Sequence, residues 1–326
     1  MTASSADGPM RPVDLPAYDP VRAARNRRHA RWRRLRSPLL GAAMWGGGRL
    51  FGSLPWTQAQ ALGRRIGRLA SRIGGRDNRR MRQHLSIAFP ELDGPGQDAL
   101  ALACWEHLGT SLGELLHLRY RDPAEANDHV EVHGFEVVEA LRQEKRPILI
   151  LTGHCGNWEM ISAANRSHGL DLVAMGRASD ERHVAETVTA LRQHLGTTTI
   201  ARGSSGSSRQ MLKTIRRGGA LALLIDQDIV TEGVWVPFFG RLAFTPTAAA
   251  DIALRLGGAA VPTFAERLED GSNRVTFYPP LELEDCCRGA TATMTAAIEA
   301  QIRRRPEQWV WMHRRWRHRP PEECAP

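Results

Sequence analysis

Cysteine is scarce in this chain, and its few occurrences lack the spacing of a metal site. Only five cysteines occur among 326 residues. Two of them are adjacent, and no Cys-x-x-Cys pair is present. An odd number of scattered thiols disfavours both a disulfide framework and a zinc site. The pattern favours a reducing compartment, and we expect neither a metal nor a cofactor.

Long apolar runs are also lacking. The first 20 residues contain no apolar core of a signal peptide, so we expect no secretory signal. The most apolar N-terminal stretch, 37–56, holds five glycines, two prolines and Arg49. A spanning helix needs about 20 predominantly apolar residues. The stretch is therefore a weak anchor at most.

Positive charge, by contrast, is abundant. The net charge is +9, and residues 21–36 contain eight arginines and no acidic residue. Such a balance favours an anionic partner, for which the candidates are a membrane surface, an acidic protein or nucleic acid. The arginine run is either a contact for phosphate groups or a solvated tail. We take residues 1–36 as a disordered basic tail.

Residues 57–73 have the periodicity of an amphipathic helix. Apolar residues recur at helical spacing, and four arginines fill much of the remaining surface: Leu62, Ile66, Leu69, Ala70, Ile73, Arg64, Arg65, Arg68 and Arg72. One interpretation is a helix that lies on a membrane surface. The other is a helix that packs on the core and exposes a basic face. Together with the arginine run and the apolar stretch, the helix predicts a membrane-associating segment over 37–75.

From residue 147 onward, short apolar runs alternate with helical stretches. The predicted strands are 147–152, 172–175, 197–200, 220–225, 259–264 and 274–279, with helices near 157–168, 180–195, 206–218, 246–257 and 290–305. This alternation predicts an α/β domain, spanning 76–320, with a central, mostly parallel mixed sheet flanked by helices.

The segment "LTGHCGNWEM", 151–160, places polar residues directly after a predicted strand. Sites of parallel sheets lie at the carboxyl ends of strands. His154 lies there, and Asn157 is a suitable N-cap for the next helix. If His154 belongs to the loop, its ring can reach Glu159. The carboxylate would then fix the tautomer of an imidazole that acts as general base.

Two other chemistries use the same segment. Cys155 is a possible nucleophile, although no second histidine or asparagine motif supports a triad. A zinc site is the other, but His-x₄-Glu is not the His-Glu-x-x-His pattern that aligns two ligands on one helical face. Both are weaker interpretations than the His154 base.

Four blocks, in order, resemble one family. "GHCGNWE" resembles the His-x₄-[Asp/Glu] block of glycerolipid-type acyltransferases, in the form found in bacterial lipid A biosynthesis (lauroyl/myristoyl) acyltransferases. The other blocks are "LSIAFPEL" at 85–92, the Asp-Gln and Phe-Phe-Gly segment at 218–246, and "PEQWVWMHRRWRHRP" at 306–320. The resemblance covers about 40–320.

The resemblance implies an enzyme at the cytoplasmic face of the inner membrane. It would move a fatty acyl chain from acyl carrier protein, or from acyl-CoA, to a hydroxyl of a lipid A precursor or related glycolipid. His154 and Glu159 would form the catalytic dyad. Asn157, Arg177 and Asp226 are the candidate substrate-binding residues, with Arg177 suited to an oxyanion or a phosphate.

The C-terminal segment leaves alternatives open. Trp309, Trp311 and Trp316 are interleaved with arginines. In isolation this suits nucleic acid, but it equally suits a lipid interface or a packed strand with buried tryptophans. We expect no nucleic-acid partner. The competing function is a basic membrane- or nucleic-acid-binding protein with an inert site.

Overall fold

The computed structural model describes residues 46–176, 182–201 and 206–320. The basic run 21–36 and Arg177 lie outside these ranges. Within them, residues 46–53 are helical. The boundaries expected between a tail, a membrane-associating segment and an α/β domain stay predictions.

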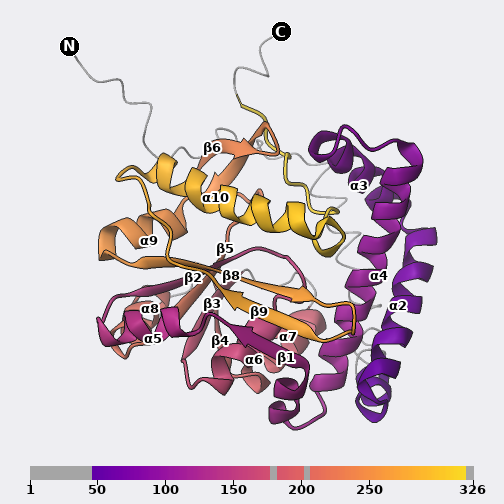
Figure 1. The fold of residues 1–326 in the computed structure, drawn as a ribbon, viewed down its shortest axis with the longest axis horizontal. Helices are drawn as coiled ribbons and strands as arrows, with labels where there is room; N and C mark the ends of the chain where they lie inside the picture. Colours follow the sequence, from indigo (N-terminus) through magenta and orange to yellow (C-terminus); the bar gives the residue numbers. More distant parts are fainter. Residues whose placement is uncertain (1–45, 177–181, 202–205, 321–326) are drawn as a thin grey trace, which may run out of the picture.

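A seven-stranded sheet forms the centre, in the order β1-β9-β8-β2-β5-β3-β4 (Figure 1). Its strands are β1 Val130–His133, β2 Ile148–Thr152, β3 Leu172–Gly176, β4 Thr197–Ala201, β5 Ala220–Leu224, β8 Ala259–Arg267 and β9 Asn273–Phe277. The five strands from β8 to β4 are parallel, whereas β9 is antiparallel to β8 and β1 pairs parallel with β9. The predicted mostly parallel mixed sheet is confirmed.

Helices cover both faces of this sheet because β2 is apolar on both sides. Ile148 and Ile150 pack into one cluster, with helices α5, α6 and α7. Leu149 and Leu151 point the other way, toward α9 and α10. The helices are α5 Glu136–Gln143, α6 Met160–Ser167, α7 Arg182–His194, α8 Ser207–Arg216, α9 Ala248–Leu256 and α10 Cys287–Arg304, with the 3₁₀ helices η1 Pro123–His129 and η2 Pro306–Gln308.

Several elements were not expected from the sequence, among them β1 and α5. Helix α3 spans Gly75–Ala88, and a hairpin is made by β6 Gly233–Phe238 and β7 Arg241–Pro246. The Phe-Phe-Gly segment is its turn: Phe239 has φ 51° and Gly240 has φ 71°. Two positive φ angles are what a two-residue hairpin turn requires. Phe238 and Phe239 are thereby turned into the core.

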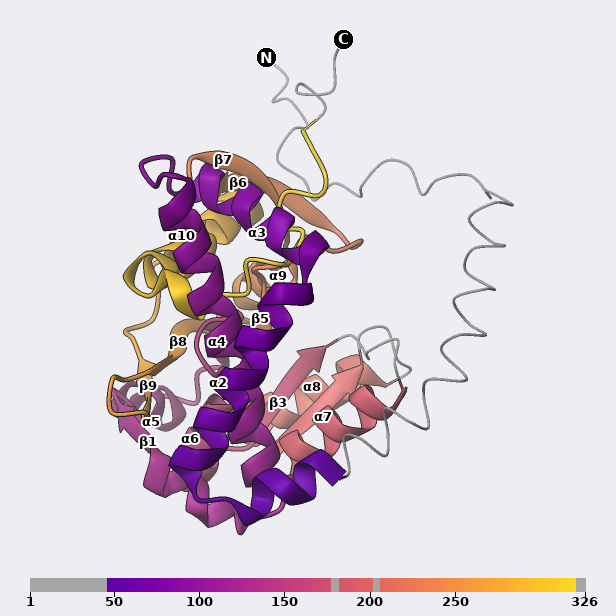
Figure 2. The same ribbon diagram turned by 90° about the vertical axis from the view of Figure 1, so that its right-hand side faces the viewer.

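Helix α2, Trp56–Ile73, runs along α4, Gly94–Leu118, at the outer side of the molecule (Figure 2). The seam is made of small residues, because a Cβ at Gly63 or Gly67 would overlap the backbone of α4. The larger apolar residues of α2 face outward instead, with Ile66, Leu69 and Ile73 exposed. The helix is therefore both packed on the domain and apolar on its free face. Among the helices described, none has the length and apolar character to cross a bilayer.

Candidate active site

The two central residues of the site, His154 and Asp226, follow two adjacent strands. Thr152 at the end of β2 pairs with Leu224 at the end of β5, and each chain continues two residues further, to His154 and Asp226. One oxygen of Asp226 accepts a hydrogen bond from Nδ1 of His154 at 2.8 Å. The other accepts the backbone N–H of His154 at 2.8 Å and Trp309 Nε1–H at 2.9 Å. The carboxylate therefore fixes both the loop and the ring.

The charge state of Asp226 follows from these donors. Burial alone would raise the pKa of its carboxyl, but His154 and the N–H donors outweigh burial and hold the pKa below its usual range. The ionised carboxylate can only accept hydrogen bonds, so it favours the His154 tautomer with the proton on Nδ1. Nε2 of His154 is then left as the basic nitrogen.

Glu159 does not take the position we expected for it. Its carboxylate accepts two hydrogen bonds from Nε of Arg192, at 2.8 and 3.0 Å, and one from Nη2 at 2.6 Å. It also accepts from Nε1 of Trp158 at 3.0 Å. The carboxylate that holds the ring of His154 belongs to Asp226 instead. The conformation of the loop explains this difference. Gly156 turns the chain with φ 60°, and Glu159 then lies at the N-cap position of α6.

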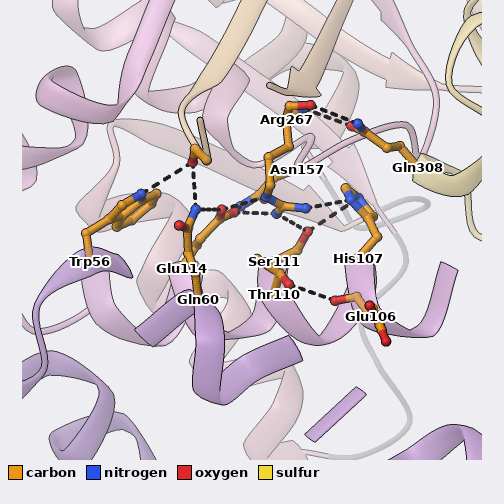
Figure 3. Close-up of polar contacts among 11 residues, drawn as sticks. Trp56, Gln60, Glu106, His107, Thr110, Ser111, Glu114, Asn157, Arg267 and Gln308 are labelled. Carbon is orange, nitrogen blue, oxygen red and sulfur yellow. Dashed lines mark hydrogen bonds and ion pairs between the residues drawn. The ribbon is translucent and has the colours of Figure 1, made fainter. Parts of the chain in front are cut away.

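Asn157 likewise differs from the expectation. It does not cap α6, whose N-cap position is Glu159, and no side-chain cap bond is made there. Its side chain is buried and donates to Oε2 of Glu114 at 2.7 Å. Figure 3 shows that Glu114 also accepts hydrogen bonds from Gln60 of α2 and from the guanidinium of Arg267. Asn157 therefore ties the loop that carries His154 to α4, and a direct role in substrate binding stays a prediction.

A pocket of about 290 Å³ opens beside His154, at the carboxyl ends of β2, β3 and β5. It is lined by the apolar ends of β3 and β5 and by a small set of polar groups: His154, Arg192, Gln227, Asp228 and Arg317. Arg177 follows β3 directly but lies outside the described residues. His154 lines the pocket, whereas Cys155 does not.

Cys155 is turned away from the pocket into the core. It is 3% exposed, and burial followed by the charge of Asp226 raises the pKa of its thiol well above the usual range. A thiol in that state is a poor nucleophile. The geometry favours the histidine base over the cysteine alternative.

Cys155→Ser is expected to keep most of the enzymatic activity. The hydroxyl replaces an inert thiol, so only packing changes. The turnover number should stay within about threefold of wild type, since no reacting group is removed, and a small drop in melting temperature is expected. Loss of turnover together with an acyl-thioester trapped on the wild-type protein would favour covalent catalysis by Cys155.

The C-terminal tryptophans belong mainly to the core. Trp309 and Trp311 are buried, and their rings meet edge-on with centroids 4.6 Å apart. Cys155 forms an isolated bridge with Trp309, and Gly156 N–H donates to the carbonyl of Gln308 at 2.7 Å. The C-terminal segment therefore supports the His154 loop, and these two side chains do not form a lipid or nucleic-acid surface.

Several groups at the site were missed from the sequence. No local signal marked Arg192, His313 or Arg267, because each reaches the site from a different element. Only Gln227 had a usable hint, since it lies between two aspartates directly after a strand.

A ring nitrogen left basic by a buried carboxylate, beside a pocket at the strand ends, is the arrangement that general-base catalysis requires. Comparison with known sequences identifies the chemistry. The family model described as Bacterial lipid A biosynthesis acyltransferase matches residues 28–318. The chain belongs to this family and is an acyltransferase.

Individual relatives agree at low identity. The lipid A biosynthesis myristoyltransferase of Escherichia coli (strain K12) is 25% identical over 80% of this chain and 82% of its own length. The lauroyltransferase of the same organism is 26% identical over 82% of this chain and 88% of its own length. A phosphatidylinositol mannoside acyltransferase of Mycobacterium tuberculosis (strain CDC 1551 / Oshkosh) is 24% identical over 76% and 79%.

Proposed function

We propose that this acyltransferase moves a fatty acyl chain from a thioester of acyl carrier protein, or from acyl-CoA, to a hydroxyl of a lipid A precursor or related glycolipid. The observation that carries the chemistry is the contact of Asp226 with His154, which lines the pocket. The lipid A relatives support the acceptor class, and the mannoside relative widens it to other glycolipids.

The proposed reaction uses one proton twice. Nε2 of His154 takes the proton of the acceptor hydroxyl while the oxygen attacks the thioester carbonyl. The tetrahedral intermediate then collapses, the carbon–sulfur bond breaks, and the departing sulfur receives the proton from Nε2. Asp226 stays ionised throughout and stabilises the imidazolium that forms between the two steps. Glu159 acts on Arg192, which it holds at the pocket wall.

Transfer can be tested directly with purified full-length protein. It should convert a lipid A precursor to an ester one acyl chain heavier when given acyl carrier protein loaded with labelled laurate or myristate. Acyl-CoA with the same chains tests the second donor. Each donor is supplied in a separate reaction, and mass spectrometry quantifies the ester formed in each. No ester with either donor and with both lipid A and mannoside acceptors would refute the proposal.

We further propose that the free face of α2 contacts an anionic membrane. Ile66, Leu69 and Ile73 are exposed along one side of the helix, at 41%, 58% and 82%. Two exposed arginines of the same helix lie beside Leu69, Arg65 four residues before it and Arg72 three residues after it. Apolar side chains beside a basic rim are the composition of an interfacial helix. This arrangement agrees with an acceptor that is itself a membrane lipid.

Replacing Ile66, Leu69 and Ile73 together by Gln should weaken binding to anionic vesicles. Each buried apolar side chain is worth about 1.5–3 kcal/mol, so the loss should exceed about 100-fold and persist at high salt. Sedimentation with phosphatidylglycerol vesicles measures it. Leu212→Gln, at an exposed leucine of α8, is the matched control. Equal binding by the triple variant and the control would refute the contact.

A further inference from the structure

Gln227 lies between two aspartates, and each of them accepts hydrogen bonds from the backbone and the ring of one histidine. Asp226 binds the backbone N–H and the ring Nδ1 of His154. Asp228 binds the backbone N–H of His318 at 2.8 Å and its Nδ1 at 2.6 Å. Both carboxylates are buried. The backbone on each side of Gln227 is therefore fixed, and its side chain has a defined starting point at the pocket wall.

The amide nitrogen of Gln227 lies against the ring of His154. Its distances are 3.0 Å to Nε2 and 3.2 Å to Nδ1. A point so nearly equidistant from both ring nitrogens cannot lie in the ring plane, because it would overlap a ring carbon. The amide therefore lies over the ring face, where an N–H makes only a weak contact. The in-plane lone pair of Nε2 is left free for a hydroxyl proton.

His313 holds this amide from the other side. Its Nε2 lies 2.9 Å from the amide nitrogen of Gln227, and the rings of His313 and His154 have centroids 5.1 Å apart. Burial, and then the neighbouring His154, lowers the pKa of His313 to about 4. His313 is thus neutral at neutral pH and accepts one amide hydrogen of Gln227. Among the residues that the structure describes, the second amide hydrogen has no partner better than the face of the His154 ring.

We infer that the side-chain amide of Gln227 donates a hydrogen bond to the oxyanion formed during acyl transfer, with His313 as its positioning residue. This inference rests on the proposed function. When the hydroxyl oxygen attacks, the electron pair of the carbonyl moves onto its oxygen, and it returns as the carbon–sulfur bond breaks. A donor beside Nε2 is close to the carbon that the deprotonated hydroxyl attacks, and redirecting it sacrifices only a weak contact.

The predicted signature is a loss in the chemical step alone. Gln227→Leu keeps the side-chain size and removes the donor, and it should slow single-turnover transfer by about 10²-fold, as removal of one oxyanion donor does. The KM values for acyl donor and lipid acceptor should stay near wild type. His313→Ala should slow the same step less strongly. The double variant should be no slower than Gln227→Leu, because His313 acts through Gln227.

Gln83→Leu, at an exposed glutamine of α3, is the matched control for an added leucine and should keep wild-type transfer. Thermal melts identify any variant that fails to fold, and Gln227→Glu gives a second test, because a carboxylate beside the oxyanion should slow transfer even more. An active wild type with undiminished transfer by Gln227→Leu would overturn this inference and leave the proposed function intact. A wild type inactive with every donor and acceptor would refute the proposed function itself.

Discussion

Asp226→Asn is expected to slow acyl transfer by about 10²–10⁴-fold, the contribution of a well-placed general base. Three N–H groups converge on the two oxygens of Asp226, from the backbone and ring of His154 and from the Trp309 indole. Asparagine offers one oxygen and one NH₂ group, so it cannot accept all three. If the NH₂ group faces Nδ1, the ring must carry its proton on Nε2, and the base is lost.

The same substitution should also lower stability, by about 1–3 kcal/mol for an unsatisfied buried donor. Stability and catalysis are separated by measuring single-turnover rates well below the melting temperature of the variant. The KM for the acyl donor, whether loaded acyl carrier protein or acyl-CoA, should change little because Asp226 faces the histidine. Wild-type transfer in a folded Asp226→Asn protein would show that His154 needs no carboxylate partner.

Glu114→Ala is expected to destabilise the protein by about 3–5 kcal/mol, the cost of stranding one member of a buried ion pair. The side chain of Glu114 is fully buried and receives hydrogen bonds from Gln60, Asn157 and the guanidinium of Arg267. These donors come from α2, the His154 loop and β8 (Figure 3). Loss of these hydrogen bonds should therefore loosen the loop that carries His154 as well as the contact between α2 and α4.

Urea unfolding measures this effect, and the exposed pair between Arg68 and Glu106 provides the control. Glu106→Ala should cost no more than about 1 kcal/mol, as surface pairs do. The double variant Glu114→Met/Arg267→Met should be more stable than Glu114→Ala, because no unpaired charge stays buried. A loss below about 1 kcal/mol for Glu114→Ala would contradict the structural importance of the network.

The sequence predicted the central strands well because β2 and β5 are apolar on both faces, whereas β1, which alternates polar and apolar residues, was missed. Runs such as 147–152 and 220–225 therefore stood out, and they correspond to β2 and β5. The order of the strands was not predictable, since no local pattern says that β5 lies beside β2. Helix α2 shows the same limit: its periodicity was visible, but the packed face proved to be the one with Gly63 and Gly67.

The sequence singled out His154 as the centre of the candidate site but did not indicate the groups that contact it. His154 was found because it follows a strand and precedes a helix. Glu159 was chosen as its partner because it is near in sequence, whereas the contact is made by Asp226, 72 positions away. Asp226 was placed at the correct sheet edge, but its pairing depends on strand order. Contacts of this kind are fixed by tertiary structure, so no recognisable spacing in the sequence marks them.

The comparison that tests the account most directly is the single-turnover rate of acyl transfer for wild type, Asp226→Asn and Glu159→Gln under one set of conditions. Both substitutions remove one buried carboxylate charge, but only Asp226 contacts His154. Pairing of His154 with Asp226 predicts a loss of about 10²-fold or more for Asp226→Asn and a much smaller loss for Glu159→Gln, whose main effect should be a lower melting temperature. A larger catalytic loss for Glu159→Gln than for Asp226→Asn would contradict the assignment of the His154 partner.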